Sequence, residues 1–168
     1  GNSRPASGAE HHLVHLWDME VVNGHLDALH GEKVSAGTML VLLEYKKIAD
    51  AIRKGNCKVH TCTEEDRELL QSTFGKKGIL GAIEKENTPE LLDDVSTKEL
   101  SDTLPGILKI IDALPAVTDM QEMMNTAGCV SRVRDIGLPG EVIEESLRLA
   151  PYTRRRLSLL RLRKMLTY

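Results

Sequence analysis

The sequence predicts an all-α protein, and two observations carry this prediction. Only 3% of the 168 residues are aromatic. Leu, Ala, Glu, Lys and Arg dominate, which favours helices over a β-sandwich built from aromatic and β-branched residues. No segment has the alternation of a convincing strand, and no internal repeat is present. We therefore expect one multi-helix domain over residues 1–168.

Periodicity and stop signals define the expected helices of the N-terminal part. The first is predicted over residues 8–23, where Asn23 and the following glycine form a stop signal. The second is predicted over residues 31–54. Its first half is apolar nearly all round, which is typical of a helix with neighbours on several sides. Thr63, followed by three carboxylates, predicts the N-cap of a helix that ends near residue 74.

Six further helices are predicted, over residues 79–86, 89–95, 97–114, 118–126, 139–149 and 151–166. Pro105 is expected to kink or split the third of these. The last is strongly basic, because residues 148–168 contain seven basic and no acidic side chains. A charge run of this kind is usually a solvated face of a helix.

Charge and cysteine content narrow the possible partners and compartment. The net charge of −3 provides no strong field for nucleic acid or acidic lipid. Cys57, Cys62 and Cys129 form an odd set without disulfide-framework spacing, which fits a reduced, cytoplasmic protein. No apolar run is long enough to span a bilayer, so membranes are not expected as partners. The chain begins with Gly1 rather than Met, which suggests a tag remnant or the C-terminal part of a longer protein.

Two histidine segments are the most informative motifs. GAEHHLVH begins at Gly8 and HGEK begins at His30. On a helix, His11 and His15 lie four residues apart on one face, and His30 immediately precedes the second expected helix. The positive end of that helix disfavours a protonated ring, which keeps His30 available as a ligand. The residues thus allow a divalent metal site. Surface or core histidines whose ring nitrogens are hydrogen-bonded explain the same spacing.

The stretch RPASGAEH from Arg4, His15 and the later HGEKVSAGT resemble the C-terminal helical domain of the iron-containing alcohol dehydrogenase superfamily. That superfamily includes glycerol dehydrogenase, glycerol-1-phosphate dehydrogenase and dehydroquinate synthase. The SGAEH stretch is closest to glycerol-1-phosphate dehydrogenase, whereas HGEK is shared more widely. The specific motifs cover residues 4–38. The resemblance implies the multi-helix C-terminal domain of a dehydroquinate-synthase-like fold.

The resemblance also implies roles for four residues. His11 and His30 match the two histidine ligands of a divalent metal ion, which is zinc, iron or nickel in such proteins. His15 matches a histidine near substrate and cofactor that relays a proton, so it is the expected catalytic residue. Arg4 lies seven residues before His11, where dehydroquinate synthase has a substrate-binding arginine. Simple surface exposure is the alternative for Arg4.

Several features of the family are absent or altered. Its remaining metal ligand, an Asp or Glu, comes from an N-terminal domain whose Gly-rich loop holds NAD or NADP, and this chain contains no such loop. Cofactor binding is therefore expected through that missing domain. Leu16 and Trp17 replace the Pro-Leu of many alcohol dehydrogenases, and Val14 replaces a glycine of dehydroquinate synthase. These departures disfavour both of those branches.

The leading prediction is the metal- and substrate-binding domain of an NAD(P)-dependent polyol or polyol-phosphate dehydrogenase, incomplete as an enzyme alone. A dehydroquinate-synthase-like lyase domain is one alternative. The other is a non-enzymatic interaction module whose basic C-terminal helix binds a polyanion through Arg154, Arg155, Arg156, Arg161, Arg163 and Lys164. CKVHTC from Cys57 has unsuitable spacing for zinc and is expected to be a loop with buried thiols. The sequence is compatible with a homo-oligomer.

Overall fold

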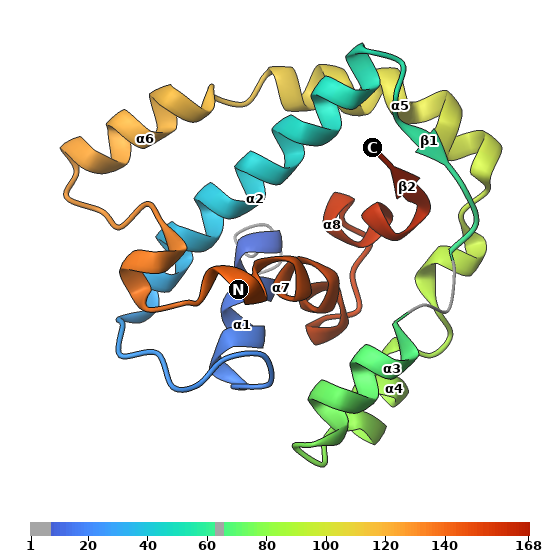
Figure 1. The fold of residues 1–168 in the computed structure, drawn as a ribbon. Helices are drawn as coiled ribbons and strands as arrows, with labels where there is room; N and C mark the ends of the chain where they lie inside the picture. Colours follow the sequence, from blue (N-terminus) through green and yellow to red (C-terminus); the bar gives the residue numbers. More distant parts are fainter. Residues whose placement is uncertain (1–7, 63–65) are drawn as a thin grey trace, which may run out of the picture.

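The computed structural model describes residues 8–62 and 66–168 and is built mainly from helices (Figure 1). The longest helix, α2 (His30–Arg53), crosses the molecule, whereas α3 (Arg67–Leu70) and α4 (Leu80–Asn87) lie apart from it. It contacts α1 (Ala9–Asp18), α5 (Thr97–Asp112) and α6 (Val117–Thr126). The predicted all-α class is confirmed.

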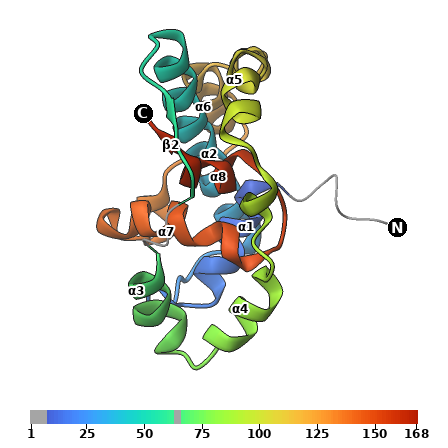
Figure 2. The ribbon, with the colours of Figure 1, turned by 90° about the vertical axis from the view of Figure 1, so that its right-hand side faces the viewer.

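The remaining elements are short. The α-helices are α3 (Arg67–Leu70), α4 (Leu80–Asn87), α7 (Ile143–Leu149) and α8 (Leu159–Leu162). A π-helical turn at Gln71–Gly75 links α3 to α4, and this pair lies at the end of the molecule away from α5 and α6 (Figure 2). The 3-10 turns are Leu91–Asp94, Val133–Ile136, Gly140–Val142, Ala150–Thr153 and Arg163–Met165.

A small antiparallel pair of strands was not expected from the sequence. Strand β1 (Lys58–Val59) pairs with β2 (Leu166–Thr167), so that Lys58 lies opposite Thr167. Each strand has two residues, which is too short for a recognisable alternation of apolar and polar side chains. The pairing ties the end of the chain to the segment that follows α2.

Two apolar cores lie along α2. The first joins α1, the N-terminal half of α2 and α7, and buries Leu13, Leu16 and Trp17 of α1. The indole nitrogen of Trp17 donates to the Ser146 hydroxyl at 3.0 Å, so its polar atom is also satisfied. The second core packs Ile48 of α2 against α5 and the C-terminal segment. The predicted central position of α2 is confirmed.

Helix α1 ends five residues earlier than predicted. Its last residue is Asp18, and Glu20 already has a positive φ of 53°. The side-chain amide nitrogen of Asn23 donates to the backbone carbonyl of Trp17 at 3.1 Å, which satisfies one of the free carbonyls at the helix end. Asn23 therefore closes the helix by folding back, instead of occupying its last turn.

Two further predictions concern Pro105 in α5 and the start of α3. Pro105 lies inside α5, which continues as one helix from Thr97 to Asp112. The Ser96 hydroxyl accepts from the Glu99 amide at 3.3 Å and caps the start of this helix. The N-cap expected at Thr63 lies outside the described residues, and α3 begins at Arg67.

The prediction of one basic helix over residues 151–166 is wrong. After the 3-10 turn Ala150–Thr153 the chain becomes extended, and only Leu159–Leu162 form an α-helix. The Ser158 hydroxyl accepts from the Arg161 amide at 3.2 Å and caps this short helix. A polyanion-binding module with a continuous basic helix therefore loses its structural basis.

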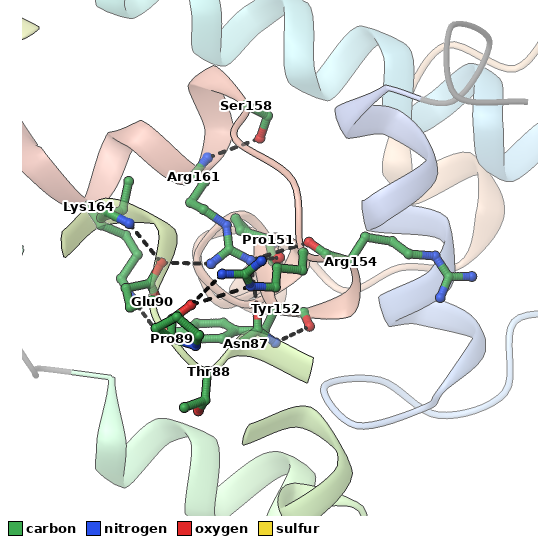
Figure 3. A network of polar contacts seen from close by, with 12 residues as sticks. Asn87, Thr88, Pro89, Glu90, Pro151, Tyr152, Arg154, Ser158, Arg161 and Lys164 are labelled. Atoms are coloured by element: carbon green, nitrogen blue, oxygen red, sulfur yellow. Dashed lines mark hydrogen bonds and ion pairs between the residues drawn. The ribbon is translucent and has the colours of Figure 1, made fainter. Parts of the chain in front are cut away.

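The hydrogen bonds of Arg161 explain why the chain between the 3-10 turn Ala150–Thr153 and α8 is extended (Figure 3). Its side chain is only 1% exposed, which overturns the expected solvated face at this position. One terminal nitrogen donates to Glu90 at 2.8 Å. The other donates to the side-chain oxygen of Asn87 and the carbonyl of Pro151, both at 2.6 Å, and to the carbonyl of Arg154 at 3.2 Å. Backbone carbonyls thus pair with a buried guanidinium instead of continuing a helical ladder.

Arg163 is also mostly buried. Its guanidinium donates to Glu44 at 3.1 Å and to Glu144 at 2.9 Å. Two carboxylates from α2 and α7 therefore hold the segment between α8 and β2. Both arginines join elements that are far apart in the sequence.

We expect Arg161→Ala to lower the free energy of unfolding by about 3 kcal/mol, because it leaves Glu90 and Asn87 without their buried partner. Urea unfolding followed by circular dichroism measures this loss. Arg155→Ala is the matched control, since Arg155 is exposed and should change stability by no more than about 0.5 kcal/mol. Equal effects of the two substitutions would contradict a structural role for Arg161.

Candidate metal and substrate site

His11, His15 and His30 lie together where α1 meets the N-terminal end of α2. The ring centroids of His11 and His30 are 6.0 Å apart, with their planes tilted by 55°. His15 is one helical turn beyond His11. Burial lowers the pKa of His15, and the charges of Arg154, His11 and His30 lower it further. The structure thus brings together the three histidines singled out from the sequence.

A glycine allows α1 and α2 to approach closely enough for this arrangement. A Cβ atom at Gly37 of α2 would lie 3.2 Å from the carbonyl oxygen of Glu10 in α1. That distance is shorter than ordinary van der Waals contact, so a side chain here would press against the backbone of α1. Near the other end of α1, Lys33 and Asp18 form an ion pair at 2.7 Å. Both contacts fix the helices that carry the histidines.

Glu10 orients the His11 ring. Its carboxylate accepts a hydrogen bond from Nδ1 of His11 at 2.8 Å and another from the Gly8 amide at 2.9 Å. Burial alone would raise the pKa of Glu10, but these hydrogen bonds outweigh burial and lower it. With its proton on Nδ1, His11 keeps the lone pair on Nε2, which is the state required of a metal ligand. Sequence reasoning did not assign this role, although Glu10 stands directly before His11 in the motif.

His12 differs from its neighbours because it is part of the core. It is 1% exposed, and within the described part of the chain neither ring nitrogen has a hydrogen-bond partner. Burial, with a smaller effect of Arg156, lowers the pKa of His12 to about 4. On a helix, His12 points about 100° away from the face that His11 and His15 share, and here that direction leads into the core.

Arg154 is the charged side chain that sequence reasoning missed. Its Nη2 lies 3.5 Å from Nε2 of His15, and its side chain extends from the C-terminal segment toward α1 (Figure 3). Arg154 belongs to the basic run, but no local pattern distinguishes it from Arg155 and Arg156. Its positive charge favours the neutral form of His15.

The described residues supply two imidazoles but not a complete metal site. Among residues 8–62 and 66–168, no group of three or more His, Cys, Asp or Glu side chains is placed to hold a metal ion. The ring separation and the Glu10 contact are compatible with two ligands of one ion. Arg4, the predicted substrate-binding residue, lies outside the described residues. Cys57 and Cys62 are both only partly buried.

Two cavities of the described structure lie away from the histidines. One has a volume of about 1010 Å³ and the other about 550 Å³, and neither is lined by His11, His15 or His30. The larger cavity contains charged groups that already pair with each other, such as Lys164 with Asp66 at 3.4 Å. These cavities offer no converging set of unpaired catalytic groups.

Within the described residues, a helical domain carries three histidines where two helices meet, as the resemblance to the iron-containing alcohol dehydrogenase superfamily implies. Comparison with known proteins finds relatives that are glycerol-1-phosphate dehydrogenases. The chain is 32% identical to the enzyme of Halalkalibacterium halodurans over 161 residues, which cover 95% of the chain and 32% of that enzyme. It is 25% identical to the Geobacillus stearothermophilus enzyme over 151 residues, or 89% of the chain and 30% of that enzyme. The predicted resemblance is confirmed, and these relatives are dehydrogenases.

The Bacillus subtilis glycerol-1-phosphate dehydrogenase is 43% identical over 74 residues, which cover 44% of the chain and 18% of that enzyme. The chain thus spans about a third of the length of the first two relatives and corresponds to a part of them. No protein-family model and no solved structure matches it. Within the described residues, no helix is both long and apolar enough to cross a membrane.

We expect the stability of the protein to fall by about 2 kcal/mol between about pH 7 and about pH 5 through His12 alone. Its pKa is depressed in the folded state to about 4, so the unfolded chain binds a proton below its ordinary pKa of 6.5 and the folded chain does not. Urea unfolding at the two pH values measures the loss. His12→Met should remove this part of the pH dependence. An unchanged pH dependence in that variant would contradict a neutral, buried His12.

Proposed function

We propose that this domain binds the metal ion and substrate of an NAD(P)-dependent polyol-phosphate dehydrogenase whose substrate is glycerol 1-phosphate. The observation that carries the proposal is the 6.0 Å separation of the His11 and His30 rings, with Glu10 fixing the first of them. The similarity to glycerol-1-phosphate dehydrogenases over 95% of the chain supports the choice of substrate.

His11 and His30 would hold the divalent ion, which is zinc, iron or nickel in this proposal. When bound, such an ion polarises the substrate oxygen and stabilises a developing alkoxide. His15 would accept the hydroxyl proton at Nε2, since burial and Arg154 favour its neutral form. The third ligand and the site for NAD or NADP would come from a further domain, as the resemblance implies. An odd set of three cysteines without disulfide-framework spacing supports a cytoplasmic location.

In an enzyme that carries this domain, His11→Ala or His30→Ala should remove the metal and nearly all activity together. His15→Ala should keep the metal and lose about 10²–10⁴-fold in rate, because it removes only the proton acceptor. Elemental analysis beside steady-state kinetics separates these outcomes. His25→Ala is the control, since His25 is exposed and hydrogen-bonds Glu20 at 3.0 Å. Metal loss in His15→Ala with retention in His11→Ala would overturn the ligand assignment.

The 168-residue chain by itself should show no polyol oxidation with NAD or NADP. Two imidazoles leave the ligand set incomplete, so zinc binding should also be weak or absent. Absorbance of the reduced cofactor and zinc titration calorimetry measure the two properties. Turnover by the purified chain would show that no further domain is needed.

A further inference from the structure

Arg154 has an exposed side chain beside His15 and no acidic partner among the described residues. Its Nη2 is 3.5 Å from Nε2 of His15. Within the described part of the chain it forms no ion pair with a carboxylate, whereas four other basic residues of the same run do. These are Arg148, Arg161, Arg163 and Lys164. A guanidinium held 3.5 Å from an imidazole nitrogen, with no carboxylate partner among the described residues, is suited to bind an anion.

The backbone of Arg154 is fixed although its side chain reaches solvent. Its carbonyl accepts hydrogen bonds from the buried guanidinium of Arg161 at 3.2 Å and from the Arg156 amide at 2.9 Å. The preceding residue, Thr153, is buried and donates its hydroxyl to the carbonyl of His12 in α1 at 3.3 Å. The base of the Arg154 side chain is therefore held against the helix that carries His11 and His15. Such support pre-organises a binding group.

Arg155 provides an internal contrast. Its guanidinium donates to the carbonyl of Pro89 at 2.9 Å, in the segment that follows α4. Adjacent arginines of the same sequence run thus have different surroundings. Only Arg154 of this pair lies at the histidines.

We propose that Arg154 binds the phosphoryl group of the substrate and sets the preference for a phosphorylated over a neutral polyol. This inference rests on the proposed function. In a small polyol phosphate the anionic group and the reacting hydroxyl are only a few bonds apart. Nη2 of Arg154 lies 3.5 Å from Nε2 of His15, the proposed proton acceptor, so a phosphoryl group a few bonds from the reacting hydroxyl is within reach of the guanidinium.

A cofactor phosphate would present the same chemistry to Arg154. The substrate is the better occupant, because the reacting carbon has to lie at the histidines and its own phosphoryl group is close to it. The phosphates of a nicotinamide cofactor are further from the reacting ring. The experiment therefore compares glycerol 1-phosphate, glycerol and NADP as separate probes.

The test is an NMR titration of the 168-residue chain that follows the imidazole resonances of His15 and His25. Glycerol 1-phosphate should shift the His15 resonances in a saturable manner, whereas glycerol should not. His25 reports non-specific effects, since its exposed ring pairs with Glu20. An absence of saturable shifts at His15, or shifts with NADP but not with glycerol 1-phosphate, would overturn the proposal.

Variants locate the binding group. Arg154→Gln should weaken binding of glycerol 1-phosphate by roughly 10- to 100-fold, and Arg154→Lys should recover part of the affinity. Arg155→Gln should bind as the unchanged chain does. Matching amide spectra show that each variant is folded. Equal binding by Arg154→Gln and the unchanged chain would refute the assignment.

The metal experiment on His11 and His30 separates this inference from the proposed function. If those substitutions leave the metal in place while Arg154→Gln loses the phosphate ester, the proposed metal ligands are wrong and the anion site stands. If the metal depends on both histidines but Arg154→Gln binds normally, the proposed function stands and the role of Arg154 is refuted.

Discussion

The close approach of α1 and α2 at Gly37 is the constraint on which the histidine geometry depends. A Cβ there would lie 3.2 Å from the carbonyl oxygen of Glu10, and a backbone atom can yield only if α1 shifts. Glu10 is also the residue whose carboxylate orients His11. Helix packing and ring orientation are therefore set at one position. Because His30 begins α2, a separation of the two helices would move the rings apart.

Arg161 has a comparable influence on the C-terminal segment. A guanidinium in the interior loses its hydration, and this cost is offset only when its donors are paired with good geometry. Here the two terminal nitrogens pair with Glu90, Asn87 and two backbone carbonyls, which draws the segment around the side chain, while the buried Nε has no hydrogen-bond partner among the described residues. A continuous helix would have used those carbonyls internally. The buried cation thus fixes the extended segment and, through it, the position of Arg154.

Features that depend on neighbouring residues could be predicted from the sequence, whereas contacts between distant segments could not. The bounds of α2 and α5 follow from periodicity and capping, which are local, and the prediction for α2 is one residue off at each end. The side-chain partners of Arg161 are Glu90 and Asn87, which lie 71 and 74 residues away along the chain. No local pattern therefore reveals that this basic residue is buried. The motif indicated His11, His15 and His30. The motif could not indicate Arg154, because the distance from Arg154 to His15 depends on how the C-terminal segment folds back.

The charges around the histidines are arranged along α1. Glu10 lies at His11, and Arg154 lies one turn further along, at His15. The carboxylate orients the His11 ring, whereas burial and the guanidinium lower the pKa of His15, and the guanidinium places positive charge beside it. A substrate whose reacting hydroxyl lies a few bonds from an anionic group matches this pairing of imidazole and guanidinium. A neutral polyol would leave the guanidinium without a partner, so the arrangement itself favours a phosphorylated alcohol.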